Sequence, residues 1–99
     1  MWWSDIAEVD PRPAVILSRV PAIRGRRLTM VDFCSTRLRG LPSEVILEPD
    51  SDPVTKPSVV QLDAVTDVAT NQLTRRMGQL SPARMHEVCA ALAIAVACD

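Results

Sequence analysis

The sequence predicts a mainly β fold of the α+β kind, a small bent or barrelled sheet with one helix packed on it. Five or six short apolar runs, each bounded by turn residues, follow one another through the first 80 residues. One stretch with helical spacing then closes the chain. With 99 residues, 47% of them hydrophobic and 23% charged, residues 1–99 are expected to form a single domain. A domain of this size often completes its burial with a second copy, so we expect a homodimer.

Each predicted strand is an apolar run that ends at turn residues. The predicted strands are residues 2–6, 14–17, 28–33, 43–47, 58–62 and a weaker one at 75–80. Residues 9–13 are expected to form a turn, because Pro11 and Pro13 have no N–H to donate to a ladder. Residues 18–27 and the proline-rich residues 48–57 are expected to be loops.

The last element has the signals of an amphipathic helix. Ser81 suits the N-cap position and Pro82 suits the first helical position. Apolar side chains then recur every three or four residues, at Met85, Val88, Cys89, Leu92 and Val96. This spacing predicts that one face of the helix packs on the sheet.

Positive charge is concentrated between residues 11 and 40. Seven arginines stand there against one acid, Asp32, which gives a local charge of +6, whereas four basic residues and eleven carboxylates give −7 elsewhere. The arginines are Arg12, Arg19, Arg24, Arg26, Arg27, Arg37 and Arg39. Arginine binds phosphate oxygens through paired hydrogen bonds, so a nucleic-acid backbone is the first partner to consider. A solvated charged loop is the alternative.

Most cofactor and metal chemistry is disfavoured by the residue pattern. The three glycines are isolated, so neither a phosphate-binding loop nor a dinucleotide motif is present. His86 is the only histidine and has no second metal ligand at helical spacing other than carboxylates or thiols that are expected to face elsewhere. The cysteines, Cys34, Cys89 and Cys98, are odd in number and are not spaced as a metal site or a redox pair. We therefore expect no metal, no cofactor and reduced thiols.

The location of the protein is expected to be the cytosol. The first residues lack a basic start followed by a long apolar stretch, and the longest uncharged apolar run, residues 88–98, is too short to cross a bilayer. Aromatic residues are also few, namely Trp2, Trp3 and Phe33. An extended base-stacking platform is therefore disfavoured, although one tryptophan could stack on a base while the other packs in the core.

One pair of residues is suited to chemistry at phosphorus. Arg12 precedes one apolar strand and the Ser35 hydroxyl ends another. Ser35 has neither a nucleophile elbow nor a histidine base, so acyl transfer is disfavoured. The alternative for Ser35 is a turn hydroxyl that bonds its own backbone. Cys34 could be a nucleophile, but such a cysteine is more often a small buried hydrophobe.

Four blocks of sequence resemble the MazF/PemK family of toxin endoribonucleases. The blocks are residues 12–19, which begin Arg-Pro-Ala-Val, 34–45 with Cys-Ser-Thr and Arg-Gly-Leu-Pro-Ser-Glu-Val, 59–63 with Val-Val-Gln-Leu-Asp, and 76–82 with Arg-Met-Gly-Gln-Leu-Ser-Pro. Their order and spacing cover nearly the whole chain. The resemblance implies a small SH3-like β-barrel with a C-terminal helix, the architecture shared by MazF and CcdB toxins, and a homodimer.

The resemblance also implies a reaction. Family members cut single-stranded RNA at short sequences without a metal, by attack of the 2′-hydroxyl on the adjacent phosphate. Arg12 matches the family arginine that donates to the phosphate oxygens, and Ser35 stands where many relatives have threonine. These two residues are the expected catalytic pair. Three departures from the family are the absence of its usual Arg-Gly-Glu before the first strand, a shorter first loop, residues 7–10, and Asp32 with Phe33 in place of a small residue and a proline.

Further residues are expected to contact RNA. These are Arg19, Thr36, Arg37, Arg39 and Asp63. The arginines would bind phosphates, with solvated turns as the alternative. Asp63 would accept a hydrogen bond from a base, with a loop-capping carboxylate as the alternative.

The resemblance implies a cognate MazE-like antitoxin whose acidic C-terminal segment folds over the RNA groove. The basic window at residues 11–40 has the complementary charge. A non-catalytic toxin of the CcdB kind, or a protein that only binds RNA or antitoxin, is the other hypothesis.

Overall fold

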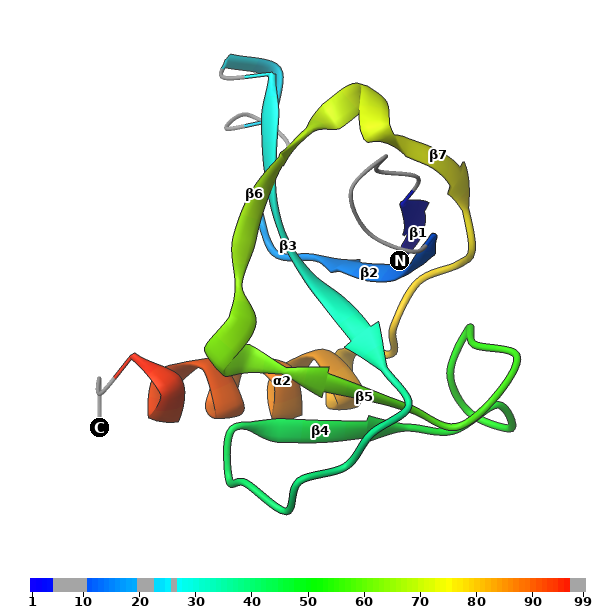
Figure 1. The fold of residues 1–99 in the computed structure, drawn as a ribbon, viewed down its shortest axis with the longest axis vertical. Coiled ribbons are helices and arrows are strands. Elements are labelled where there is room, and N and C mark those ends of the chain that lie inside the picture. Colours follow the sequence, from blue (N-terminus) through cyan, green and yellow to red (C-terminus); the bar gives the residue numbers. More distant parts are fainter. Residues whose placement is uncertain (5–10, 20–22, 26, 97–99) are drawn as a thin grey trace.

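The structure is a computed structural model that describes residues 1–4, 11–19, 23–25 and 27–96. Seven strands, two short 3₁₀ turns and one long helix lie in this part of the chain (Figure 1). They are β1 (Trp2–Ser4), β2 (Arg12–Ile16), β3 (Leu28–Ser35), β4 (Glu44–Leu47), β5 (Ser58–Gln61), η1 (Leu62–Ala64), β6 (Thr66–Ala69), η2 (Thr70–Gln72), β7 (Leu73–Arg76) and α2 (Pro82–Ala95). The predicted mainly β fold with a C-terminal helix is confirmed.

All strand pairs are antiparallel, and the order β4-β5-β3-β2-β1-β7 describes the path of the sheet. Strand β3 is long enough to have two neighbours on one edge. Its first half pairs with β6 and its end pairs with β5. Strands β4 and β7 lie at opposite ends of the path and do not pair, so the bent sheet of the described residues is not closed.

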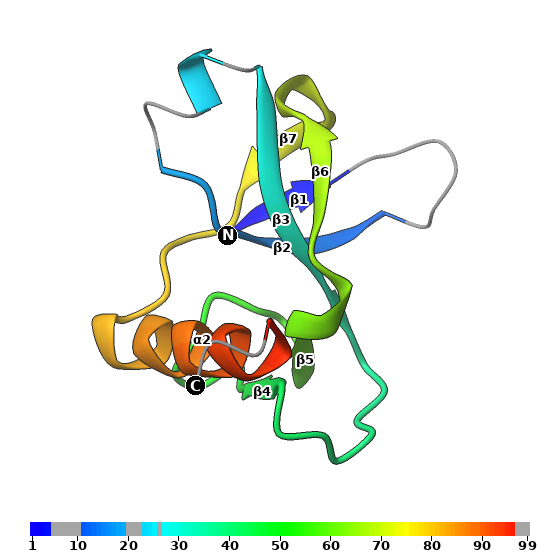
Figure 2. The ribbon, with the colours of Figure 1, turned by 90° about the vertical axis from the view of Figure 1, so that its left-hand side faces the viewer.

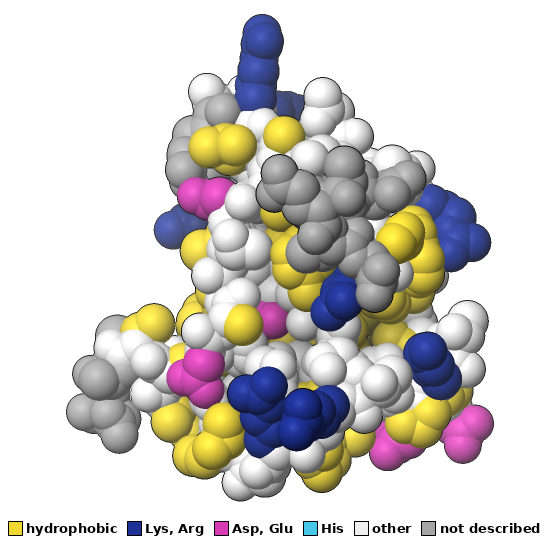
Figure 3. Space-filling view, in the orientation of Figure 1, with side chains coloured by type: hydrophobic (Ala, Val, Ile, Leu, Met, Phe, Trp, Pro, Cys, Tyr) yellow, Lys and Arg dark blue, Asp and Glu magenta, His cyan; other side chains and the backbone are white. Residues whose placement is uncertain are grey.

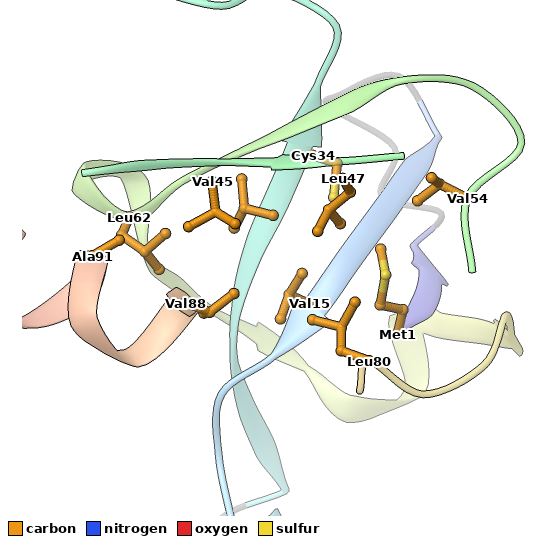
Figure 4. Close-up of a cluster of buried hydrophobic side chains, with 11 residues drawn as sticks. Met1, Val15, Cys34, Val45, Leu47, Val54, Leu62, Leu80, Val88 and Ala91 are labelled. Atoms are coloured by element: carbon orange, nitrogen blue, oxygen red, sulfur yellow. The ribbon is translucent and has the colours of Figure 1, made fainter. Parts of the chain in front are cut away.

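Helix α2 packs at the β4 and β5 end of the sheet (Figure 2). Its buried residues, Val88 and Ala91, face the main hydrophobic core, to which strands β2, β3, β4 and β5 also contribute. The members of this core are Met1, Val15, Cys34, Val45, Leu47, Val54, Val60, Leu62, Leu80, Val88 and Ala91 (Figure 4). A smaller cluster, Ala14, Val31 and Val68, lies on the opposite face of β2 and β3, as strand alternation requires.

The start of the helix agrees with the sequence prediction. Ser81 is the N-cap and its hydroxyl accepts a hydrogen bond from the Arg84 backbone N–H at 3.1 Å, with Pro82 at the first helical position. Cys89 was predicted on the packed face but is exposed, because the face turned to the core is the one with Val88 and Ala91. Residues 48–57 form the predicted loop.

Two expectations about strands were wrong. Arg12 and Pro13 belong to β2 and not to a turn. Proline is accommodated because β2 pairs with β3 only from Ala14 onward, so at Pro13 the strand has a single neighbour, β1. Strand β6 was missed, because only its Val68 is buried and the rest of the strand does not read as an apolar run.

The remaining differences are shifts of boundaries. The last strand is Leu73–Arg76 rather than residues 75–80, and residues 5–6 of the first predicted strand lie outside the described part. So do the short loop 7–10, Arg26 and Cys98, and parts of the predicted turn 9–13 and loop 18–27. No helix among the described residues is long and apolar enough to cross a membrane.

Candidate active site

A groove of about 530 Å³ lies where β1, β2 and β3 meet the loop of residues 48–57. Its polar lining side chains are Arg12, Ser35, Thr36, Thr55, Lys56 and Ser58. Three of the residues predicted from the sequence, Arg12, Ser35 and Thr36, are thus brought together. We refer to this feature as the phosphate groove, since its cationic and hydroxyl groups are those that bind phosphate oxygens.

The register of the sheet explains why Arg12 and Ser35 share the groove. Strands β2 and β3 pair with Ala14 opposite Phe33 and Val15 opposite Asp32. The pairing ends there, so Arg12 at the start of β2 and Ser35 at the end of β3 lie just beyond the last pair. Both residues line the same groove.

Ser35 makes the local turn contact and keeps a free hydroxyl proton. Its Oγ accepts a hydrogen bond from the Arg37 backbone N–H at 3.1 Å, which is the local turn contact expected as the alternative. A hydroxyl that accepts one hydrogen bond still has its own O–H to donate. The turn therefore fixes the position of the Oγ and leaves a donor for an acceptor in the groove.

Cys34 lines the groove but is not disposed to act as a nucleophile. The residue is 5% exposed and belongs to the main core. Burial, followed by the negative charge of Asp32, raises the pKa of the Cys34 thiol to about 12. At neutral pH the reactive thiolate is therefore negligible. The prediction of a small buried hydrophobe is confirmed.

The two tryptophans point to opposite sides of β1. Trp3 lines the phosphate groove, and the guanidinium of Arg75 lies 5.4 Å from the centre of its ring. Trp2 lines a different cavity, of about 470 Å³, together with Ile16 and Leu73. Alternation along the strand thus places one tryptophan at the groove and the other on the opposite face.

The other predicted RNA contacts lie outside the groove lining. Arg19 follows the opposite end of β2, and Arg37 and Arg39 are exposed in the segment after β3. That segment is held by Glu44, whose carboxylate accepts the Arg39 N–H at 3.1 Å and the Leu41 N–H at 2.7 Å. On the face of the molecule drawn in Figure 3, the basic side chains form separate groups rather than one patch. The role of these arginines stays a prediction.

Asp63 lies in η1, directly after β5. Its carboxylate accepts a hydrogen bond from the hydroxyl of the buried residue Ser43. This is the loop-capping contact considered as the alternative, and the exposed position of Asp63 leaves base recognition as a prediction. No group of three or more His, Cys, Asp or Glu residues that could hold a metal occurs in the part of the chain that the structure describes.

Lys56 is a lining residue that sequence reasoning missed. It is the only lysine of the chain, and it stands next to Pro57 in a loop dominated by acidic residues and prolines. The only signal was this single cation in an otherwise acidic loop, because its place in the same groove as Arg12 and Ser35 depends on the folding of residues far apart in the chain.

Comparison with known proteins finds relatives over the whole chain. A family model described as PemK-like, MazF-like toxin of type II toxin-antitoxin system matches residues 2–96. The chain is 47% identical over 99 residues to the probable endoribonuclease MazF5 of Mycobacterium tuberculosis. The match covers 100% of this chain and 91% of that protein.

Solved structures with a similar fold belong to the same kind of protein. One is described as an endoribonuclease in complex with its cognate antitoxin from Mycobacterial species. It has a TM-score of 0.86 and 26% identity, and the match covers 99% of this chain and 91% of that one. Another is the Mycobacterium tuberculosis toxin MazF-mt6, with a TM-score of 0.85 and 25% identity, covering 99% of this chain and 96% of that one.

Proposed function

Because this chain belongs to the PemK-like, MazF-like family of toxins of type II toxin–antitoxin systems, we propose that its phosphate groove cleaves single-stranded RNA without a metal ion. Similarity over the full chain to a protein named as a probable endoribonuclease supports the activity. The geometry that supports the site is the presence of Arg12 and Ser35 in the lining of one groove.

The proposed reaction takes its nucleophile from the substrate. The 2′-hydroxyl next to the scissile phosphate loses its proton and attacks phosphorus, the bond from phosphorus to the 5′-oxygen breaks, and that oxygen gains a proton. The products are a 2′,3′-cyclic phosphate and a 5′-hydroxyl, and no water is consumed. The protein therefore has to position the phosphate in line and stabilise the charge that develops on its oxygens.

Arg12 and Ser35 have complementary roles in this proposal. The Arg12 guanidinium donates to the non-bridging oxygens, with a geometry that suits two parallel hydrogen bonds. The Ser35 hydroxyl, held by the Arg37 N–H, donates a further hydrogen bond to the phosphate. Thr36 adds a hydroxyl to the same wall of the groove.

The proposed partners follow from the family. A relative of this fold has been solved in complex with its cognate antitoxin, which supports an antitoxin as the partner of this chain. We propose that the toxin acts in the cytosol as a homodimer until an acidic segment of the antitoxin covers the phosphate groove. RNA and antitoxin are then expected to compete, and both complexes should weaken with salt.

The function is tested by incubating the purified protein with a long single-stranded RNA in excess EDTA and mapping the fragment ends. Site-specific cuts with cyclic-phosphate ends are expected. Arg12→Ala should lower the rate about 100-fold or more, the range for loss of a donor to a developing oxyanion. Ser35→Ala should lower it less, and Ser35→Thr should restore it.

Arg24→Ala is the matched control, because Arg24 is exposed and does not line the groove. It should cut at the wild-type rate. Intact RNA across several substrates would contradict the proposal and favour a toxin that acts by protein contact alone.

A further inference from the structure

Lys56 is the second cation of the phosphate groove. The lining residues that the structure describes include two cations, Arg12 and Lys56, and no carboxylate. Lys56 makes no ion pair with any described residue. A positive charge without a carboxylate partner in a groove of hydroxyl groups is a site for an anionic ligand.

The loop that carries Lys56 is held at both sides of this residue. Before it, Val54 is 7% exposed and packs in the main core, where Figure 4 shows it near Met1 and Leu47. After it, the buried Ser58 donates a hydrogen bond from its hydroxyl to the Lys56 carbonyl at 2.9 Å. The backbone of Lys56 is thus fixed beside the groove, although its side chain is exposed.

The base of the same loop is fixed by helix α2. The Asp52 carboxylate accepts the Glu48 N–H at 2.8 Å and forms a two-point ion pair with Arg84, with Nε–Oδ1 and Nη2–Oδ2 distances of 3.1 Å each. The Asp52 side chain is 1% exposed. A buried pair of this geometry restrains its loop much more than a surface pair does.

We propose that the Lys56 ammonium binds the RNA phosphate held in the phosphate groove and shares with Arg12 the stabilisation of its developing charge. This inference rests on the proposed function, because it takes RNA as the ligand. Lys56 acts as a fixed positive charge and transfers no proton. Its contact exists in the bound state and strengthens as the phosphate gains charge during 2′-hydroxyl attack.

Two measurements on the full chain test the inference. The first is the dissociation constant of a labelled single-stranded oligonucleotide with every 2′-hydroxyl methylated, so that it cannot be cut, over a series of salt concentrations. Loss of one phosphate contact should lower the slope of log Kd against log salt by about 0.7 in Lys56→Gln. Lys56→Arg should keep the wild-type slope, and so should Arg24→Gln, which removes a distant charge.

The second measurement is the single-turnover rate with saturating cleavable RNA in EDTA. Lys56→Gln should lower this rate about 10- to 100-fold, whereas Lys56→Arg should stay within about threefold because it retains the charge. Arg24→Gln again serves as the control. Because the Lys56 side chain is exposed, the thermal unfolding of all three variants should match that of the wild type.

The outcomes separate the inference from the function on which it rests. Equal salt slopes and equal rates in the wild type and Lys56→Gln would overturn the role of Lys56 while the ribonuclease function stands. A reduced slope in Lys56→Gln, with RNA left intact by the wild type, would support the phosphate contact and contradict the ribonuclease function. A wild-type protein that neither binds nor cuts RNA would overturn both.

Discussion

Asp52, in the loop after β4, and Asp32, in the middle of β3, are both buried, with exposed fractions of 7% and 0%. Asp52 has a full set of partners, namely the Glu48 N–H, the Ser51 hydroxyl and the Arg84 guanidinium. Neither carboxylate oxygen of Asp32 has a hydrogen-bond partner among the described residues. The same side-chain type is thus buried in two different ways within one small fold.

The difference shows how a fold accommodates a buried carboxylate. For Asp52, a guanidinium and a backbone N–H replace the water that the carboxylate lost on burial. Asp32 has no such replacement. Burial, followed by the charge of Asp63, raises its pKa from 3.8 to about 7. One region therefore gains stability from a pair, whereas the other depends on protonation.

The largest expected loss of stability follows from removal of the Asp52 pair. Asp52→Ala should lower the free energy of unfolding by about 2–3 kcal/mol, below the largest values for buried pairs because the Arg84 side chain is 22% exposed and can be hydrated. Thermal unfolding measures this, with Asp50→Ala as the control, since Asp50 is exposed in the same loop. Cleavage should also slow if the loop positions Lys56. Equal unfolding temperatures of Asp52→Ala and Asp50→Ala would mean that the Asp52 pair does not stabilise the fold, and the contrast with Asp32 would then be lost.

Asp32→Asn should have the opposite effect at alkaline pH. Between about pH 4 and pH 7 the folded state binds a proton that the unfolded state has released, so the stability of the wild type falls as pH rises through this window. Above pH 7 the wild type carries the full free-energy cost of a buried, ionised Asp32 carboxylate. Asparagine stays neutral, so the variant should gain stability relative to the wild type by an amount on the order of 3 kcal/mol between pH 4 and pH 8.

Chemical unfolding at several pH values checks this prediction. Asp63→Asn sharpens it, because removal of that negative charge should shift the midpoint of the wild-type pH dependence to lower pH. The thiol of Cys34 also faces Asp32, but its pKa of about 12 leaves it neutral throughout. A difference between Asp32→Asn and the wild type that does not change with pH would mean that Asp32 is charged in the fold.

Gly78→Ala tests the Asp52 loop from its other side. Gly78 has a φ of +146°, and a Cβ there would lie 2.6 Å from the Cβ of Pro53, next to Asp52. The clash and the unfavourable backbone should lower the free energy of unfolding by about 1–2 kcal/mol. Gly25→Ala is the control, since its Cβ meets nothing within 4 Å, and it should be neutral or slightly stabilising. Equal stability of the two variants would show that the loop moves freely.

Local signals in the sequence predict much of this fold. The N-cap at Ser81, the apolar runs of β2 and β3 and the proline-rich loop are each visible in a few neighbouring residues. Strand β6 was missed because it is held by the edge of β3 rather than by an apolar pattern of its own. The same limit explains Pro13, whose place in a strand depends on where a neighbouring strand begins.

The candidate site was predictable only in part. Arg12 and Ser35 are indicated by their places beside two apolar runs and by the resemblance to a family, and the fold brings both into one groove. Lys56 could not be found in this way, because its position depends on a pair between Asp52 and Arg84, which are 32 residues apart. Contacts across such distances in the chain leave no mark in local composition.

The smallest expected effect concerns Glu44, which holds the segment after β3 at the surface. Hydrogen bonds from the Gln61 side chain and from the N–H groups of Leu41 and Arg39 lower the pKa of Glu44 below its ordinary value. Its contribution to stability is therefore present at neutral pH and is lost as pH falls through the lowered pKa.

Glu44→Gln should lower the unfolding temperature less than Asp52→Ala, because the site is solvated, and should speed hydrogen exchange at the Leu41 N–H. Glu48→Gln, at an exposed position, should change neither. If Glu44→Gln destabilised the fold as much as Asp52→Ala, burial would not be what separates a strong carboxylate anchor from a weak one.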